Sequence, residues 1–224
     1  MNPIITTFLK LKLTDLYALR FLKNNKEEMY EMLCAMNKTE ALFGGAYKYF
    51  HLSEILDQYK PNHILELGSG FSTGVFALYC KNNKAKACTF EHSEKWCRNT
   101  LENLGDLSNY INVKNVNYIE EKESPPKTYY NEYPDAGIDF VYVDGPPLTE
   151  NAKINGNVVN WDVIRMIEQG NIPRVIVVDI RLSTARYLFE KYNHLYEYYP
   201  RESKKRFLKY RYHSIFIKKN APVS

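Results

Sequence analysis

The sequence lacks the long apolar runs that cross membranes, since no stretch approaches roughly 18 consecutive apolar residues. Lys10 and Lys12 interrupt the segment that would have to be the apolar part of a secretory signal peptide. Glycine and proline are scarce, with ten of each in 224 residues, which excludes a collagen-like or low-complexity chain. We therefore expect a soluble protein of the cytoplasm.

Cysteine is rare and irregularly spaced. The four thiols, at Cys34, Cys80, Cys88 and Cys97, show no C-x-x-C spacing, and Cys80 and Cys88 fall at a predicted helix end and in a predicted strand. This usage favours reduced thiols in a cytosol-like compartment over a disulfide framework.

A strong excess of one charge sign is also absent. The 30 Lys and Arg against 26 Asp and Glu give a net charge of +4, and the hydrophobic fraction of 45% is ordinary for a globular protein. Such a mild positive charge permits a polyanionic partner without requiring one, because lysines usually cover a solvated face. Nucleic acid is therefore not the partner we expect, and the composition leaves the oligomeric state open.

The length of 224 residues fits one α/β domain with additions better than two independent cores. We divide this compact unit into an N-terminal helical extension or lid, residues 1–60, and a main domain, residues 61–224. Within 5–33, apolar residues recur near helical spacing, with lysines and arginines among them. Helices that cover a sheet edge or a substrate cleft fit this pattern better than a helix on a membrane surface.

From residue 47 onward, helix and strand signals alternate. Helices are predicted at 47–58, 72–81, 94–104, 161–169 and 184–192, and strands at 63–67, 86–91, 111–118, 138–143, 174–180, 195–199 and 214–218. This alternation predicts an α/β fold with a doubly wound, mostly parallel sheet, and ligands at the carboxyl ends of its strands. Two segments resist the pattern, 120–137 and 146–160, and are candidate substrate loops.

The most informative segment is HILELGSGFSTG, which begins at His63. A strand that runs into Gly68-x-Gly70 and opens a helix lets the backbone approach a ligand, and the helix N-terminus offers donors to an anion. A dinucleotide fingerprint would have a third glycine where Thr73 stands, and it would not usually place Glu66 before the first glycine. Glu66 suits a ligand with a positive group, such as S-adenosylmethionine; a purely structural turn is the alternative.

Glu91 ends the second predicted strand, 21 residues after Gly70. A carboxylate about 20 residues after the glycine loop is placed to accept hydrogen bonds from both hydroxyls of a ribose. The alternative is an exposed acid that opens the next helix. His92 would flank the adenine or cap that helix, and Tyr118 would lie near the adenine or pack in the core.

These residues resemble the motifs of class I S-adenosylmethionine-dependent methyltransferases. The match runs from about residue 64 to 217, with Glu66-x-Gly68-x-Gly70 as the first motif, Glu91 as the ribose acid and DFVYVDGPP, from Asp139, as the fourth-strand motif. The resemblance implies a Rossmann-like sheet of seven strands in the order 3-2-1-4-5-7-6, with the seventh strand antiparallel. Within the family, LELGSGxST followed by VDGP is similar to small-molecule and sugar O-methyltransferases of the bacterial and viral glycan-modifying type.

Methyl transfer from a sulfonium needs in-line positioning and loss of the acceptor proton, which is difficult for a sugar hydroxyl at neutral pH. A divalent cation solves this by lowering the pKa of the hydroxyl. Asp144 and Asp179 end the fourth and fifth predicted strands, which are neighbours in the expected order, so both carboxylates are expected on one Mg²⁺ or Mn²⁺.

The resemblance to metal-dependent enzymes such as the catechol O-methyltransferases supports this pair, with two departures. Their usual Asn after the second acid is Ile180 here, and Pro147 stands where they have a lysine. The alternative is that Asp144 alone holds the substrate or acts as the base, while Asp179 orders a loop.

Other candidates are weaker. Gly44-Gly45 would let the N-terminal segment fold over the methionine end of the cofactor, or would form a plain helix-entry turn. His51 is a candidate base, against the commoner role of a satisfied helix histidine. Arg181 would bind an acidic substrate or form a surface ion pair. The run 201–213, which mixes cations with aromatic residues, would suit a polyanion or form a solvated hairpin.

The sequence therefore predicts an S-adenosylmethionine-dependent O-methyltransferase that acts on a small-molecule or glycan acceptor, foremost a sugar hydroxyl. A methyltransferase acting on RNA, protein or a phenol, a nicotinamide oxidoreductase and a cofactor-free binding module are the alternatives. The predicted catalytic residues are Asp144 and His51, the metal ligands Asp144 and Asp179, and the substrate contact Arg181. The predicted cofactor-binding residues are Gly45, Glu66, Gly68, Ser69, Gly70, Ser72, Thr73, Glu91, His92 and Tyr118.

Overall fold

The structure is a computed structural model that describes residues 3–37, 45–146, 158–202 and 211–219. Most of the candidate substrate loop 146–160, part of the run 201–213 and Gly44 lie outside these described residues. Within the described ranges, none of the helices has the length and apolar character needed to span a membrane. The four cysteines are free thiols, as their spacing predicts.

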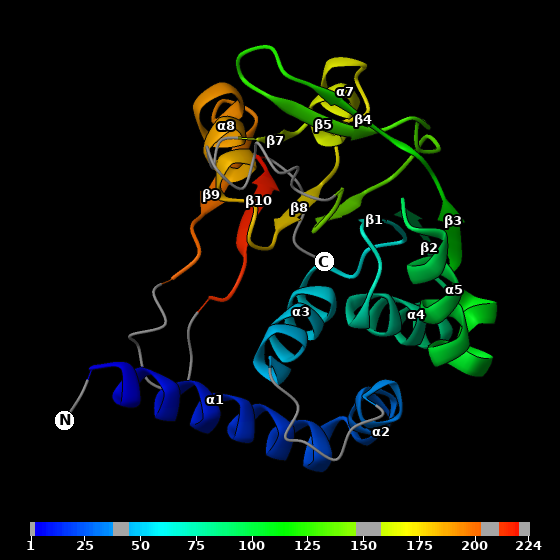
Figure 1. The fold of residues 1–224 in the computed structure, drawn as a ribbon, viewed down its shortest axis with the longest axis vertical. Coiled ribbons are helices and arrows are strands. Elements are labelled where there is room, and N and C mark those ends of the chain that lie inside the picture. Colours follow the sequence, from blue (N-terminus) through cyan, green and yellow to red (C-terminus); the bar gives the residue numbers. More distant parts are fainter. Residues whose placement is uncertain (1–2, 38–44, 147–157, 203–210, 220–224) are drawn as a thin grey trace.

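A seven-stranded mixed sheet forms the centre of the molecule (Figure 1). From edge to edge its strands are β3 (Asn112–Asn115), β2 (Lys86–Glu91), β1 (His63–Leu67), β6 (Phe140–Val143), β8 (Val175–Val178), β10 (Ser214–Lys218) and β9 (Tyr196–Tyr199). The first five pair in parallel, and β10 is antiparallel to both of its neighbours. The predicted α/β class with a mostly parallel sheet is therefore confirmed.

The numbering of the strand order differs from the expected 3-2-1-4-5-7-6, because three strands of a second sheet lie between the others in the chain. These are β4 (Tyr118–Glu121), β5 (Lys127–Tyr130) and β7 (Val159–Asn160). Counted within the seven-stranded sheet alone, β3-β2-β1-β6-β8-β10-β9 is the order 3-2-1-4-5-7-6.

The second sheet corrects two expectations. The strand predicted at 111–118 ends at Asn115, and Tyr118 already belongs to β4. The segment 120–137, expected as a loop, contains β5, which pairs antiparallel with β4. Both strands are only four residues long, and Pro125 and Pro126 lie between them, so the local pattern indicates a break although distant pairing makes a sheet.

Helices cover both faces of the main sheet (Figure 1). On one side lie α3 (Ala46–Tyr59), α4 (Phe71–Asn83), α5 (Glu94–Leu104) and the 3₁₀ helix η1 (Gly105–Tyr110), and on the other α7 (Asp162–Glu168) and α8 (Leu182–Tyr192). Successive side chains of a strand enter opposite cores: Ile64 faces α3 and α4, whereas Leu65 faces α7 and α8. This explains why β6 and β8, FVYV and VIVV, are unbroken apolar runs.

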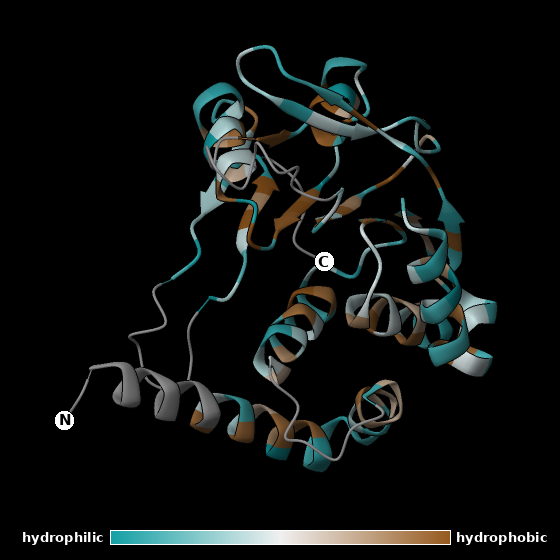
Figure 2. Cartoon of the chain, in the orientation of Figure 1, coloured by the Kyte–Doolittle hydropathy of each residue, from teal (hydrophilic) through white to brown (hydrophobic). Residues whose placement is uncertain are grey.

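The N-terminal helices α1 (Pro3–Asn25) and α2 (Glu27–Met36) pack against α3 and α4 (Figure 1). Figure 2 shows mixed hydropathy over α2 and the coloured part of α1, and buried Leu22 and Leu33 belong to the same core as α3, α4 and β1. A Cβ at Gly74 would lie 2.6 Å from the sulfur of Met32, so α2 packs directly on the backbone of α4. Asp15 of α1 accepts hydrogen bonds from the backbone nitrogens of Gly45 and Tyr47, each at 3.0 Å.

Two glycine turns touch where β1 and β6 end. Gly68 has a φ of +92°, and a Cβ there would lie 2.8 Å from the nitrogen of Gly145. A Cβ at Gly145 would in turn lie 2.7 Å from the Oη of Tyr130. Side chains are excluded from this crossing by both conformation and space.

Gly68→Ala is therefore expected to lower the free energy of unfolding by about 2–4 kcal/mol, through backbone strain and through the clash with Gly145. Gly170→Ala is the matched control, because Gly170 has a similar φ of +82° but no atom within 4 Å of a new Cβ. Gly170→Ala should lower the free energy of unfolding through backbone strain alone, by about 1 kcal/mol. Urea unfolding measures both, and equal losses would contradict the close packing of the two turns.

Candidate active site

A cavity of about 370 Å³ opens at the carboxyl ends of β1, β2 and β6. It is lined by Lys48, Tyr49, Gly68, Ser69, Gly70, Phe71, Ser72, Glu91, His92, Trp96, Tyr130, Asp144, Gly145, Pro146 and Arg181. This end of a doubly wound sheet is where such folds bind their ligands. The cavity therefore brings together most of the residues that the sequence singles out.

The glycine loop leaves a cradle at Gly70. Its backbone is extended, and a Cβ there would meet no atom within 4 Å, so the space above it is open. The Thr73 hydroxyl accepts a hydrogen bond from the Gly70 nitrogen at 2.9 Å and is buried, so Thr73 closes the first turn of α4. Phe71 and Ser72 line the cavity at the N-terminus of α4, where the helix dipole favours a carboxylate.

Glu66 lies beneath this loop and is fully buried. Its carboxyl oxygens accept hydrogen bonds from the hydroxyls of Ser72, at 2.5 Å, and Thr89, at 2.7 Å. Burial raises the pKa of Glu66 to about 7, although the two hydroxyls act in the opposite direction. The carboxyl thus ties the loop to β2, a bracing role that differs from the expected contact with a positive group of the cofactor.

Glu91 stands at the rim of the cavity. Its Oε2 accepts hydrogen bonds from the nitrogen and the hydroxyl of Ser69, each at 2.9 Å, and its Oε1 lies 2.9 Å from the His92 Nδ1. The ring of Tyr118 packs edge-on against His92, with 5.4 Å between the ring centroids. Trp96, which the sequence reasoning missed, also lines the cavity and is 59% exposed.

Lys48 forms ion pairs with Asp144 and Asp179, the two aspartates that the sequence predicts as metal ligands. Its Nζ lies 3.2 Å from Asp144 Oδ2 and 2.7 Å from Asp179 Oδ2. The side chains of Lys48 and Asp179 are 14% and 3% exposed, against 31% for Asp144. Burial alone would lower the pKa of Lys48, but the two carboxylates outweigh it and raise that pKa above its ordinary value.

The donor set therefore does not fit the expected Mg²⁺ or Mn²⁺. Asp144 and Asp179 are already paired with a buried ammonium, which a divalent ion would have to displace. Among the residues that the structure describes, no three His, Cys, Asp or Glu side chains gather as a metal site. Sequence reasoning missed Lys48 because nothing local marks it, and its partners lie 96 and 131 residues away.

His51, the expected base, points to a different neighbour. Its Nδ1 lies 2.9 Å from the Nδ1 of His213, and the two rings are stacked. His213 is fully buried, with its Nε2 3.4 Å from the Tyr142 hydroxyl and 4.0 Å from Asp179 Oδ1. Burial lowers the pKa of His51 to about 4. This pair is a buried, neutral packing element beside Asp179, in line with the alternative of a satisfied helix histidine.

Arg181 and Gly45 both have backbone partners. The Nε and Nη2 of Arg181 donate to the carbonyl oxygen of Asp144, at 3.1 and 2.5 Å, so Arg181 clamps the turn after β6 as well as lining the cavity. Gly45 precedes α3 with a φ of +92°, and Asp15 accepts from its nitrogen. It forms the helix-entry turn that places Lys48 in the first turn of α3.

A buried polar cluster that the sequence did not reveal holds the opposite wall. Asp162 accepts hydrogen bonds from the Tyr130 nitrogen at 3.1 Å, from Arg165 at 2.7 Å and from the Asn160 amide at 3.1 Å. The Asn160 amide also donates to the Gly145 oxygen at 2.9 Å. Tyr130 is thereby fixed over the cavity, and its buried hydroxyl has no hydrogen-bond partner among the described residues.

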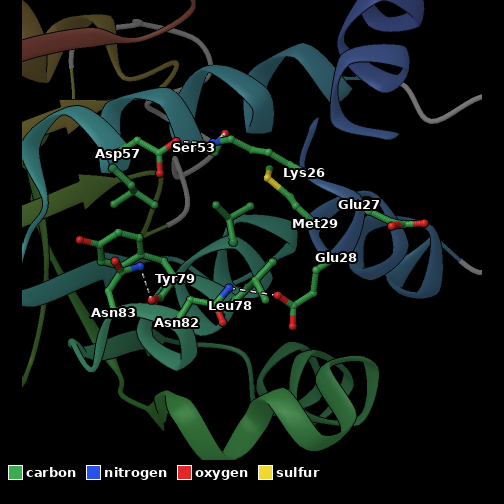
Figure 3. Close-up of a pocket in the computed structure, with 12 residues that line it drawn as sticks. Lys26, Glu27, Glu28, Met29, Ser53, Asp57, Leu78, Tyr79, Asn82 and Asn83 are labelled. Atoms are coloured by element: carbon green, nitrogen blue, oxygen red, sulfur yellow. Dashed lines mark hydrogen bonds and ion pairs between the residues drawn. The ribbon is translucent and has the colours of Figure 1, made fainter. Parts of the chain in front are cut away.

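A second cavity, of about 240 Å³, lies between α2, α3 and α4 (Figure 3). Several of its polar side chains are already paired: Lys26 binds Asp57 and Ser53, and Glu28 accepts from Asn82 at 3.0 Å. The remaining charged side chain at this cavity, Glu27, is exposed. We therefore place the chemistry at the strand ends.

No protein-family model and no curated protein matches the chain, but solved structures do. A protein of Klebsiella pneumoniae assigned as an O-methyltransferase aligns with a TM-score of 0.51 and 11% identity, over 85% of this chain and 89% of that one. An O-methyltransferase of Bacillus cereus in complex with S-adenosylhomocysteine gives 0.49 and 16%, over 86% and 90%. The methyltransferase of Podospora anserina bound to the same compound gives 0.49 and 14%, over 92% and 88%. The chain thus shares the Rossmann-like fold of the Klebsiella protein.

Glu66→Gln is expected to remove a pH-dependent loss of stability. The pKa of Glu66 is about 7 in the folded chain against an ordinary 4.5, so stability is fully present below pH 4.5 and is lost as the pH rises through 7. Relative to the parent, the glutamine variant should gain on the order of 1–3 kcal/mol between about pH 5 and about pH 8. Urea unfolding measures this, with the exposed Asp106→Asn as control. A gain that is equal at both pH values would contradict the buried, protonated carboxyl.

Tyr130→Phe is expected to stabilise the ligand-free protein by about 1 kcal/mol, because it removes a buried hydroxyl without a described partner. Tyr196→Phe is the matched control, since the buried Tyr196 hydroxyl donates to the Pro173 oxygen at 3.0 Å. Its loss should destabilise by about 1 kcal/mol. Opposite signs in thermal or urea unfolding are the expected result, and a destabilised Tyr130→Phe would show that the hydroxyl is satisfied.

Proposed function

We propose that this chain is an S-adenosylmethionine-dependent O-methyltransferase, acting on a neutral hydroxyl, foremost a sugar hydroxyl of a glycan or glycoconjugate. The observation that carries the proposal is the cavity at the strand ends, where the open cradle at Gly70, the rim acid Glu91 and the base candidate Asp144 converge. The fold shared with the Klebsiella protein, assigned as an O-methyltransferase, supports the same reaction class.

The cofactor half of the cavity extends from α4 to α5. The N-terminus of α4 would receive the methionine carboxylate, and Glu91 would accept hydrogen bonds from the ribose hydroxyls. His92 and the exposed Trp96 would flank the adenine. Glu91 already holds Ser69, so ribose binding would exchange the Ser69 hydroxyl for a ligand hydroxyl while the backbone bond stays.

The acceptor half is electrostatically balanced. Lys48 and Arg181 contribute two positive charges, and Asp144 and Asp179 contribute two negative charges, so these four groups carry no net charge. A neutral acceptor leaves this balance undisturbed. The expected acidic substrate for Arg181 is less well supported, because its guanidinium is bound to the Asp144 carbonyl.

Methyl transfer here is an in-line displacement. The acceptor oxygen forms a bond to the methyl carbon, the carbon–sulfur bond breaks, and its electron pair stays on sulfur to give S-adenosylhomocysteine. Asp144 is the more exposed of the two aspartates and would take the hydroxyl proton. No step is routed through a metal, because the carboxylates that would hold it are paired with Lys48.

Isothermal calorimetry with S-adenosylhomocysteine tests the cofactor site. Gly70→Leu should abolish binding, with at least a roughly 100-fold loss, because its side chain would fill the cradle without straining the extended backbone. Glu91→Ala should weaken binding by roughly 1.5–3 kcal/mol. Glu94→Ala is the control, since Glu94 is exposed and pairs with Arg98. Absence of binding to the parent chain, or binding of NAD in its place, would refute the proposal.

A further inference from the structure

Lys48 has one donor to spare inside the cavity. A lysine ammonium carries three N–H groups. Two of them are accounted for by Asp144 Oδ2 and Asp179 Oδ2, and the described residues provide no hydrogen-bond acceptor for the third. Because Lys48 lines the cavity together with Asp144, this donor is available to a ligand beside the candidate base.

The position of the ammonium is tightly fixed. Lys48 lies in the first turn of α3, and the nitrogens of Gly45 and Tyr47 at the start of this helix donate to Asp15 on α1. Its side chain is also packed near the Tyr49 and Tyr142 rings, with Nζ 5.6 and 5.9 Å from their centroids. A cation held this way needs no reorganisation when negative charge develops next to it.

We propose that Lys48 is the resident cation of the acceptor subsite, donating its third N–H to the acceptor oxygen, so that methyl transfer proceeds without a divalent metal. The inference rests on the proposed function, since it assigns a role within the same reaction. Lys48 here does what a metal would otherwise do, which is to stabilise the oxygen as its proton leaves.

The proposed methyl transfer needs no reactant besides the acceptor, the cofactor and the side chains named here. The acceptor O–H gives its proton to the Asp144 carboxylate, the oxygen bonds to the methyl carbon, and sulfur keeps the electron pair of the broken bond. The ammonium stays charged throughout and returns unchanged. Lys48 cannot itself be the base, because the two carboxylates hold its proton.

Electrostatics makes the ammonium and a divalent ion mutually exclusive at this place. With Lys48 present, Asp144 and Asp179 share one positive charge at hydrogen-bond distance. Binding Mn²⁺ would require the ammonium to leave a nearly closed site or to remain beside the ion as a like charge. Removing Lys48 leaves two facing carboxylates, which is a partial set of hard oxygen ligands for a divalent ion.

Mn²⁺ binding to the protein saturated with S-adenosylhomocysteine, followed by electron paramagnetic resonance, tests the inference without an acceptor. The parent chain should show no saturable binding up to roughly 1 mM Mn²⁺, whereas Lys48→Ala should gain one site. Lys26→Ala is the control, because Lys26 also pairs with an aspartate, Asp57, away from the cavity. One equivalent of Mn²⁺ on the parent, lost in Asp144→Asn, would overturn the inference.

Lys48→Ala exposes two unpaired carboxylates and is at risk of not folding, so Lys48→Met/Asp179→Asn serves as a second variant with the charge pair removed. Methyl transfer from labelled cofactor to a panel of sugars and phenols completes the test. The parent should keep full activity in excess EDTA. The double variant should lose about 10²–10³-fold in kcat, with S-adenosylhomocysteine affinity changed less than about threefold. Lys26→Met should keep parental activity.

The outcomes separate the two proposals. If S-adenosylhomocysteine does not bind, the proposed function fails. If it binds but EDTA abolishes transfer and Mg²⁺ or Mn²⁺ restores it, the methyltransferase stands and the role of Lys48 is refuted. If no acceptor in the panel is methylated, Mn²⁺ binding to the parent chain decides the question alone.

Discussion

The cavity depends on the contact between two backbone turns. Gly68 and Gly145 meet where the neighbouring strands β1 and β6 end, at a distance that leaves no room for a Cβ on either residue. The Asn160 amide holds the Gly145 oxygen, and Tyr130 lies against the Gly145 turn. Because the crossing is made of backbone, a ligand in the cavity can approach the backbone of both turns. The cradle at Gly70 and the carboxylate of Asp144 are therefore held in a fixed relation.

The acidic side chains near this crossing fall into two groups, those that line the cavity and those that do not. Glu66, fully buried, has its pKa raised by desolvation to about 7 and braces the glycine loop against β2. Glu91 and Asp144, at the cavity wall, have hydrogen-bond donors around them. Lys48 pairs with the buried Asp179, whose side chain is 3% exposed. Glu91 and Asp144 thus line the cavity, whereas Glu66 and Asp179 do not.

Local patterns predicted what local geometry determines. The strand His63–Leu67, the glycine cradle and the rim position of Glu91 follow from a motif within one βαβ unit, and the structure has them at one cavity. The short strands of the second sheet and the Asp162 cluster were missed, because they depend on partners far along the chain. The metal was expected from two aspartates on adjacent strands. Only the folded chain shows that Lys48, 96 residues before Asp144, reaches both of them.

The N-terminal extension contributes to the site as well as covering the sheet. Asp15 on α1 binds the backbone at the start of α3, and Lys48 stands in the first turn of that helix, with its ammonium at the carboxyl ends of β6 and β8. The same segment buries its apolar side chains in the core that α4 and β1 share. The contact between α1 and α3 thus holds Lys48 at the cavity, whereas the open loop at Gly70 is built by β1 and α4.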